Sequence, residues 1–225
     1  AYFYELGYRL GTVGDTYSPD VGLQKLEKYA DMYGLTETSG IEIEESSPKV
    51  STEDAVRSAI GQGNNSYSTA GLARYVTAVA NSGTCYNLTL VDKITDHSGI
   101  LLDDRSAEGR NTIDMEPAYW NAIHQGMRQV IEDKSYYNDL EINVAGKTGT
   151  AEENKNRANH ALFVCYAPYE DPEIAIATRI AYGYTSSYAA QTTKDVLKYY
   201  FELEEEEQLI TGTASHMSGS TAVTD

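Results

Sequence analysis

The sequence predicts an α+β fold in which helices come first and an antiparallel sheet follows. In the first half of the chain, apolar residues recur three and four positions apart, which is the period of a helix buried along one side. Between residues 144 and 182, three short apolar runs are separated by turn-forming residues, the pattern of antiparallel strands. With 225 residues, of which 41% are hydrophobic, the chain is large enough to bury a core.

Four helices are predicted before residue 135. They cover residues 22–33, a stretch that starts near 51, residues 69–80, and a stretch that follows Asp114. Gly34 ends the first helix, Ser51 is the expected N-cap of the second, and Asp54 lies in its first turn. The inward faces are listed by helix: Leu72, Tyr75, Val76 and Val79 in the third, and Trp120, Ile123, Met127, Val130 and Ile131 in the fourth.

The strands are predicted mainly in the last third of the chain. An early strand is expected over residues 88–96, closed by a turn at 97–99. The later strands cover residues 144–151, 160–167 and 173–182, and two prolines in 168–172 predict a turn that pairs the last two strands. A final helix over 187–203 is expected to pack Ala189, Val196, Tyr200 and Leu203 along one side.

The sequence predicts one folded domain followed by a tail. Residues 1–203 are predicted to form one folded part, and residues 204–225 an acidic run followed by a small, polar tail that we expect to be disordered from about residue 211. The chain carries no initiator methionine, and we expect it to be a fragment of a longer protein.

Charge and composition exclude several classes of function. The formal net charge of −17 argues against binding to nucleic acid or to anionic lipid, because both need a basic surface. Cys85 and Cys165 lack the spacing of a redox or zinc motif, and Cys165 sits in an apolar run that predicts a buried thiol. The four histidines never reach the spacing of metal ligands, so we expect neither a metal nor a cofactor.

The most specific motif is Gly-Lys-Thr-Gly-Thr-Ala-Glu at residues 146–152, which overlaps the strand predicted over 144–151. A phosphate-binding loop needs a glycine five positions before Gly146, and residue 141 is glutamate, so the nucleotide interpretation fails. A Lys-Thr-Gly strand is instead the third motif of serine enzymes that bind penicillin. The sequence therefore predicts one wall of an acyl-transfer site.

From Tyr2 to about Leu203, the chain resembles the transpeptidase domain of class B penicillin-binding proteins, which cross-link peptidoglycan. Four pieces carry the resemblance, in order: Tyr-Phe-Tyr-Glu-Leu-Gly at 2–7, Ile-Gly-Gln-Gly at 60–63, Leu-Ala-Arg-Tyr at 72–75 with Val-Ala-Asn-Ser-Gly at 79–83, and the motif at 146–152. The resemblance implies the penicillin-binding transpeptidase or serine β-lactamase-like fold, here incomplete at its N-terminus. It also implies that the chain begins just after the family's Ser-x-Asn motif.

The resemblance assigns roles to four residues. The backbone N–H of Thr150 would help to form the oxyanion hole, and the hydroxyls of Thr148 and Thr150 would hold the terminal carboxylate of a D-Ala-D-Ala stem peptide. Lys147 would supply positive potential, and Gly149 would let the substrate backbone approach the strand. The nucleophilic serine would be absent from this chain, so the isolated chain is predicted to be inactive. β-Lactams would bind the same wall.

Two segments imitate the missing motifs. Ser-Ser-Pro-Lys at 46–49 matches Ser-x-x-Lys formally, but the working pair needs a buried helix, and this tetrapeptide is predicted to be a surface loop. Tyr-Tyr-Asn at 136–138 falls in a connector in the wrong chain order. His160 is expected to be a packing residue with a hydrogen-bond partner, and Gln62 either lies near the site or supports a turn.

The parent protein is therefore expected to be a serine D,D-transpeptidase on the outer face of a bacterial cell membrane. Its partners would be peptidoglycan stem peptides, β-lactam antibiotics and other cell-wall synthesis proteins. Three alternatives stay open: a serine β-lactamase or D,D-carboxypeptidase of the same superfamily, a β-lactam sensor domain, and a catalytically inactive interaction domain.

Overall fold

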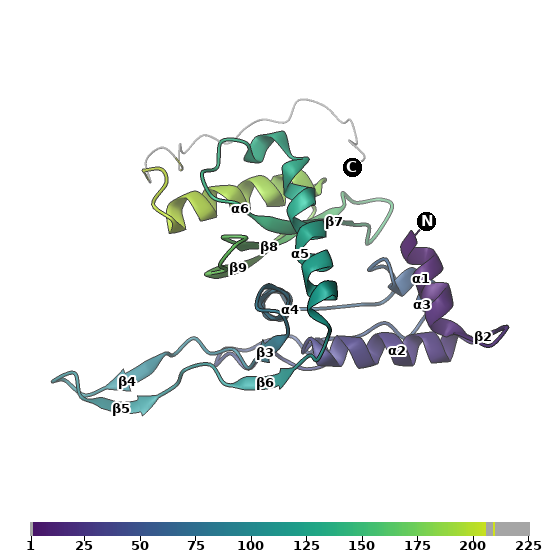
Figure 1. The fold of residues 1–225 in the computed structure, drawn as a ribbon, viewed down its shortest axis with the longest axis horizontal. Coiled ribbons are helices and arrows are strands. Elements are labelled where there is room, and N and C mark those ends of the chain that lie inside the picture. The colour runs from purple at the N-terminus through teal and green to yellow at the C-terminus, as the bar shows by residue number, and fades with distance from the viewer. Residues whose placement is uncertain (1, 206–208, 210–225) are drawn as a thin grey trace. The chain divides into compact units, whose positions relative to one another are not determined.

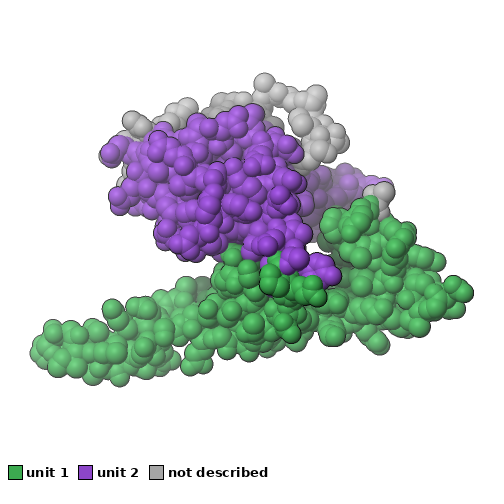
Figure 2. Space-filling model, in the orientation of Figure 1, with its two compact units in different colours: residues 1–117 green, residues 118–225 purple. Residues whose placement is uncertain are grey.

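A computed structural model describes residues 2–205 and residue 209. The chain divides into two compact units, residues 1–117 and 118–225, which Figure 2 colours separately. Helices dominate the start of the chain and an antiparallel sheet its last third, as Figure 1 shows, so the predicted α+β class is confirmed.

Unit 1 contains four helices and three small sheets. The helices are α1 (Tyr2–Gly11), α2 (Pro19–Met32), α3 (Ala55–Ser58) and α4 (Thr69–Ala80). The sheets are two-stranded and antiparallel, and they pair β1 (Thr12–Val13) with β2 (Thr16–Tyr17), β3 (Thr84–Tyr86) with β6 (Gly109–Thr112), and β4 (Lys93–Thr95) with β5 (Leu101–Asp104).

Glycines let the first three helices approach closely. A Cβ at Gly7 would lie 2.8 Å from the Ala59 Cβ, and a Cβ at Gly22 would lie 2.6 Å from the Ala55 Cβ. Both distances are below any real Cβ contact, so α1 and α2 contact α3 only because these positions have no side chain. Helix α1, which covers the Tyr-Phe-Tyr-Glu-Leu-Gly piece, was not among the predicted helices.

Helix α4 carries the most deeply buried charge of unit 1. The side chain of Arg74 is fully buried, and its guanidinium donates to the backbone carbonyls of Gly34, Glu37 and Ser39, the last two at 3.0 and 3.2 Å. Gly34 has a φ of +72°, and a Cβ there would lie 2.6 Å from Arg74 Nε. The arginine in the Leu-Ala-Arg-Tyr piece thus holds the loop that follows α2.

Two predictions in unit 1 need correction. The N-cap of α3 is Asp54, whose carboxylate accepts from the N–H groups of Val56 (2.7 Å) and Arg57 (3.3 Å), and not Ser51. Asn65 fixes the Ser51 backbone instead, because its side-chain oxygen accepts from Ser51 N at 2.8 Å. The strand expected over 88–96 is reduced to β4, since Glu42 rather than a neighbouring strand binds the Leu90 N–H.

Unit 2 is built around one sheet. Helix α5 (Pro117–Glu132) and the short 3₁₀ helix η1 (Ser135–Tyr137) lead into β7 (Ala145–Ala151), β8 (His160–Ala167) and β9 (Ile174–Ile180), and α6 (Ser186–Tyr200) follows. The strands form an antiparallel sheet in the order β7-β8-β9. The predicted strands and the hairpin between the last two are confirmed, with ends within two residues.

The core of unit 2 lies between this sheet and α6. Its buried members are Ile131, Tyr137, Val144, Ala161, Phe163, Cys165, Ala167, Ala189, Ala190 and Leu197. Cys165 is a free thiol, as predicted, and burial raises its pKa to about 12, so it stays protonated at neutral pH. The predicted inward face of α5 is also confirmed, because Trp120, Met127 and Ile131 are buried.

The inward face of α6 was predicted correctly at Ala189, which is buried, and wrongly at Val196 and Tyr200. Val196 and Tyr200 are 45% and 49% exposed, whereas Thr193 is completely buried. The Thr193 hydroxyl lies 2.6 Å from the Thr178 hydroxyl of β9 and donates to the Ala189 carbonyl at 2.8 Å. Because these hydrogen bonds satisfy the Thr193 hydroxyl, a threonine lies on the buried face of α6, where the apolar pattern predicted a valine and a tyrosine.

The tail predicted to be disordered, from residue 211 to 225, lies outside the described residues, so that prediction stays open. Every helix within residues 2–205 is too short or too polar to cross a lipid bilayer.

Candidate functional site

The Lys-Thr-Gly-Thr segment lies on an edge strand. Residues 147–150 occupy the middle of β7, which pairs with β8 on one side and, among the described residues, with no strand on the other. Lys147 lies opposite Val164, and Thr150 opposite Ala161. An edge strand exposes backbone N–H and C=O groups that an extended peptide can bind. The structure therefore brings the four predicted residues together beside a free strand edge.

The register divides their side chains between two faces. Thr148 and Thr150 lie opposite Phe163 and Ala161, which face the core shared with α6. Lys147 and Gly149 lie on the other face, and the Lys147 side chain is exposed, with its Nζ donating to the Thr148 carbonyl at 2.7 Å. One ammonium group and two hydroxyl groups thus flank the same edge from opposite sides.

Helix α6 supports the end of this segment. Thr150 Oγ1 accepts from the backbone N–H of Ser186, the first residue of α6, at 3.3 Å. Ser186 is fully buried, and Thr185 caps the helix by accepting from Ser187 N. The Thr150 side chain is therefore oriented by the positive end of a helix dipole.

The two glycines of β7 have different reasons to be glycine. A Cβ at Gly146 would lie 2.7 Å from Phe163 Cζ and 2.8 Å from the Val164 carbonyl oxygen, so the core excludes any side chain there. A Cβ at Gly149 would meet nothing nearer than the Leu162 Cβ, at 3.5 Å, which is ordinary contact. Packing within the described chain thus explains Gly146 but leaves Gly149 without a structural requirement.

This contrast gives a prediction. Gly146→Ala is expected to lower the free energy of unfolding by about 1–3 kcal/mol, because it overpacks the core. Gly149→Ala is expected to leave stability unchanged or slightly higher, since alanine loses less chain entropy on folding than glycine. Urea denaturation of both variants checks the stabilities. Equal destabilisation by the two substitutions would contradict the assignment of Gly149 to a role outside the fold.

His160 lies at the beginning of β8, directly opposite Ala151. Its ring is buried, Nε2 lies 2.9 Å from Glu153 Oε2, and Nδ1 accepts from the backbone N–H of Tyr182 at 3.2 Å. The hydrogen bond with His160 is the main cause that lowers the pKa of Glu153. The prediction of a packing histidine with a hydrogen-bond partner is confirmed, and the sequence had not identified Glu153 or Tyr182 as those partners.

Neither of the two segments that imitate other motifs, residues 46–49 and 136–138, lies at the start of a buried α-helix. Residues 46–49 are a loop in unit 1 in which Ser46 and Lys49 are exposed, as predicted. Tyr137 belongs to the core of unit 2, and its hydroxyl donates to the Ala190 carbonyl at 2.8 Å. Gln62 follows α3 between two glycines with positive φ, and its N–H donates to the Arg57 carbonyl, as a turn residue does.

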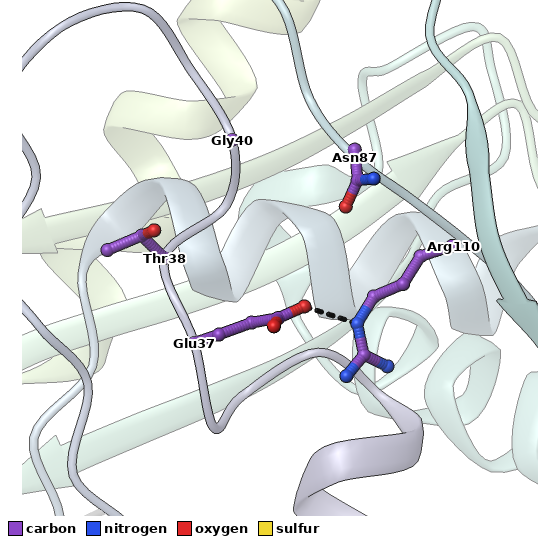
Figure 3. Close-up of a pocket in the computed structure, with 5 residues that line it drawn as sticks. All are labelled: Glu37, Thr38, Gly40, Asn87 and Arg110. Carbon is purple, nitrogen blue, oxygen red and sulfur yellow. Dashed lines mark hydrogen bonds and ion pairs between the residues drawn. The ribbon is translucent and has the colours of Figure 1, made fainter.

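Unit 1 contains an open cavity of about 760 Å³, lined by Glu37, Thr38, Gly40, Asn87 and Arg110 (Figure 3). Its one cation already has partners. Arg110 forms ion pairs with Glu37 and Asp31, and it also donates to the Asp31 carbonyl at 2.9 Å. Because the carboxylates of the chain itself occupy the guanidinium, this cavity offers little to an anionic ligand, and the candidate site is the edge of β7.

The comparisons with known proteins agree with this geometry. Residues 1–198 match the family described as the penicillin binding protein transpeptidase domain. The chain therefore belongs to this family, and the predicted class B resemblance is confirmed at that level.

Among its relatives, penicillin-binding protein 2B of Streptococcus pneumoniae (serotype 2) is 28% identical over 222 residues, with 85% of this chain and 32% of the relative covered. Peptidoglycan D,D-transpeptidase MrdA of Haemophilus influenzae is 26% identical over 238 residues, with 88% and 34% covered. The chain thus spans about a third of the length of these curated relatives.

Two solved structures share the fold. Penicillin-binding protein 2B of Streptococcus pneumoniae strain R6 superposes with a TM-score of 0.77 at 25% identity, covering 90% of this chain and 37% of that one. Penicillin-binding protein A of M. tuberculosis, in an imipenem acyl-enzyme complex, gives a TM-score of 0.73 at 19% identity, with 88% and 44% covered.

Proposed function

We propose that this chain supplies the Lys-Thr-Gly wall of a D,D-transpeptidase that cross-links peptidoglycan stem peptides. The observation that carries the proposal is the edge of β7 that pairs with no strand among the described residues, where Lys147, Thr148 and Thr150 flank a glycine that packing does not require. The names of the relatives, which include a peptidoglycan D,D-transpeptidase, support it.

The reaction assigns a task to each residue. A serine from outside this chain attacks the carbonyl of the penultimate D-alanine, a C–O bond forms, and a tetrahedral oxyanion results. The Thr150 N–H is one donor to that oxyanion, and a single such donor contributes roughly 10²–10³ in rate. The C–N bond then breaks, and the departing D-alanine takes up the proton that the serine lost. The amine of a second stem peptide attacks the acyl-enzyme, a new C–N bond forms, and the C–O ester bond breaks as the proton of the amine returns to the serine.

Recognition of the substrate involves the same segment. The substrate backbone lies along the edge of β7 as an added strand, and Gly149 leaves room for this approach. The hydroxyls of Thr148 and Thr150 bind the terminal carboxylate, and Lys147 adds positive potential, which matters in a chain of net charge −17. β-Lactams occupy the same place as mimics of D-Ala-D-Ala, and the imipenem complex of the M. tuberculosis relative supports this.

The complete protein is proposed to act on the outer face of a bacterial membrane, where its substrate lies. The membrane anchor, the serine and its lysine partner would all belong to segments outside this chain. The described residues 46–49, which form an exposed loop, support the view that the Ser-Ser-Pro-Lys match is accidental.

A labelling experiment tests the proposal. The isolated chain is expected to form no covalent adduct with a fluorescent penicillin, whereas the complete protein is expected to be acylated stoichiometrically. Intact-mass spectrometry followed by peptide mapping measures both. An adduct on Ser46 of the isolated chain, or a complete protein that resists acylation, would overturn the proposal. Release of the acyl group to water rather than to an amine would favour a hydrolase of the same superfamily.

A further inference from the structure

The loop over residues 152–159 begins two residues after Thr150, the proposed oxyanion donor, and the buried His160 follows its last residue. Ala151 and His160 form the final pair of the β7–β8 ladder, so the loop starts and ends at this pair. The His160 ring is buried and contacts groups on two sides: the Glu153 carboxylate in the loop at 2.9 Å, and the Tyr182 N–H in the turn between β9 and α6 at 3.2 Å. We call His160, Glu153 and Tyr182 the His160 bridge.

The hydrogen bonds of the bridge define the tautomer of the ring. The Tyr182 N–H donates to Nδ1, so Nδ1 carries no proton. Arg179 Nη2, a second donor, lies 3.4 Å from the same nitrogen. The single ring proton therefore belongs on Nε2, where it is donated to Glu153. The ring uses one nitrogen for the loop and the other for the turn, so one side chain makes both contacts at once.

Further contacts join the same two segments. Arg157 of the loop donates to the Tyr182 hydroxyl at 2.8 Å, and its guanidinium lies 5.5 Å from the centre of the Tyr182 ring. The Tyr182 ring lies 4.8 Å from the His160 ring, and the Tyr184 N–H donates to the Asn159 carbonyl at 3.0 Å. The loop thus contacts the turn directly through Arg157 and Asn159, and Glu153 is linked to it through His160.

The turn that receives these contacts is held in an unusual conformation. Tyr182 and Tyr184 have φ values of +54° and +67°, which cost a non-glycine residue about 1–3 kcal/mol each. Gly183 between them has no room for a side chain, since a Cβ would lie 2.8 Å from the Ile180 Cβ and 2.9 Å from the Ala161 Cβ. Such strain persists only where surrounding contacts fix the backbone, so the turn over residues 182–184 is a rigid support for the loop.

We propose that His160 is a positioning residue for acyl transfer. It ties the 152–159 loop to this support, and so holds the backbone of Thr150 and Ala151 at the place where the oxyanion forms. The inference rests on the proposed function. Its physical basis is that a donor must be fixed before the reaction, because a displacement of about 1 Å lowers the rate roughly 10²-fold.

Glu153→Ala in the complete protein is the decisive variant. The Glu153 side chain is 56% exposed, so its loss should barely change the melting temperature. Acylation by a fluorescent penicillin is nevertheless expected to slow about tenfold or more in its first-order constant, with a smaller change in the dissociation constant of the initial complex. Stopped-flow fluorescence separates the two constants.

Two controls match this variant. Glu141→Ala removes the same charge at an exposed position of unit 2, and Lys155→Ala truncates an exposed side chain within the loop itself. Both are expected to acylate at the wild-type rate.

Two substitutions of His160 test its two contacts separately. In His160→Gln the longer side chain can still reach Glu153, and in His160→Asn the shorter one can still accept from the Tyr182 N–H. Each should slow acylation, and amide exchange at Tyr182 should quicken more in the glutamine variant.

The outcomes are distinguishable. Wild-type acylation rates in Glu153→Ala and in both His160 variants would overturn the positioning role and leave the proposed function intact. If Glu153→Ala slows acylation and also lowers the melting temperature substantially, the role of the contact is merely structural. A complete wild-type protein that penicillin does not acylate would remove the proposed function and this inference together.

Discussion

Lys147→Ala in the complete protein is expected to lower the rate of β-lactam acylation by about 10²–10³-fold and to leave the fold intact. Lys147 lies on the exposed side of β7, and its ammonium group donates to the Thr148 carbonyl, so little core packing depends on it. Its proposed task is electrostatic, because it would attract the carboxylate of the substrate. Losses of this size are typical when one group that stabilises the transition state is removed.

The control for this prediction is Lys155→Ala, which removes the same charge from an exposed position a few residues further along. It should acylate normally, and circular dichroism should show unchanged melting curves for both variants. A folded Lys147→Ala protein that acylates at the wild-type rate would disprove the role assigned to this residue.

Arg74→Ala is expected to lower the free energy of unfolding by about 3–5 kcal/mol, the largest stability effect that we predict. The fully buried guanidinium binds three backbone carbonyls in the loop after α2, and each carbonyl that loses its partner inside the protein costs about 1–3 kcal/mol. Lysine cannot replace it, since one ammonium group lacks the planar fork that reaches three acceptors.

Urea denaturation followed by circular dichroism measures this effect, and amide exchange of residues 34–39 locates it. The matched control is Arg57→Ala, which removes an exposed arginine from α3 in the same unit. Arg57→Ala should change stability by less than about 0.5 kcal/mol, as exposed substitutions usually do. Similar losses in the two variants would mean that the buried contacts of Arg74 contribute little.

The sequence by itself determined the α+β class and most of the elements. Helix α4 and strand β8 have the predicted ends, because each combines a regular apolar period with clear terminal residues: Ser68 and Asn81 flank α4, and Pro168 follows β8. The Lys147-Thr148-Gly149-Thr150 segment and the family could also be identified from the sequence, since consecutive residues carry that motif.

Only the tertiary structure decided which residues across the chain support the motif. The burial of Thr193 rather than Val196 in α6 depends on a hydroxyl partner in β9. The contribution of Arg74 to stability depends on three carbonyls about 35–40 residues away in the sequence. The partners of His160 lie in two separate loops, and the steric difference between Gly146 and Gly149 arises from their neighbours on β8. Periodicity reports which residues are apolar, whereas hydrogen-bond satisfaction and close contact are properties of pairs that only the folded chain brings together.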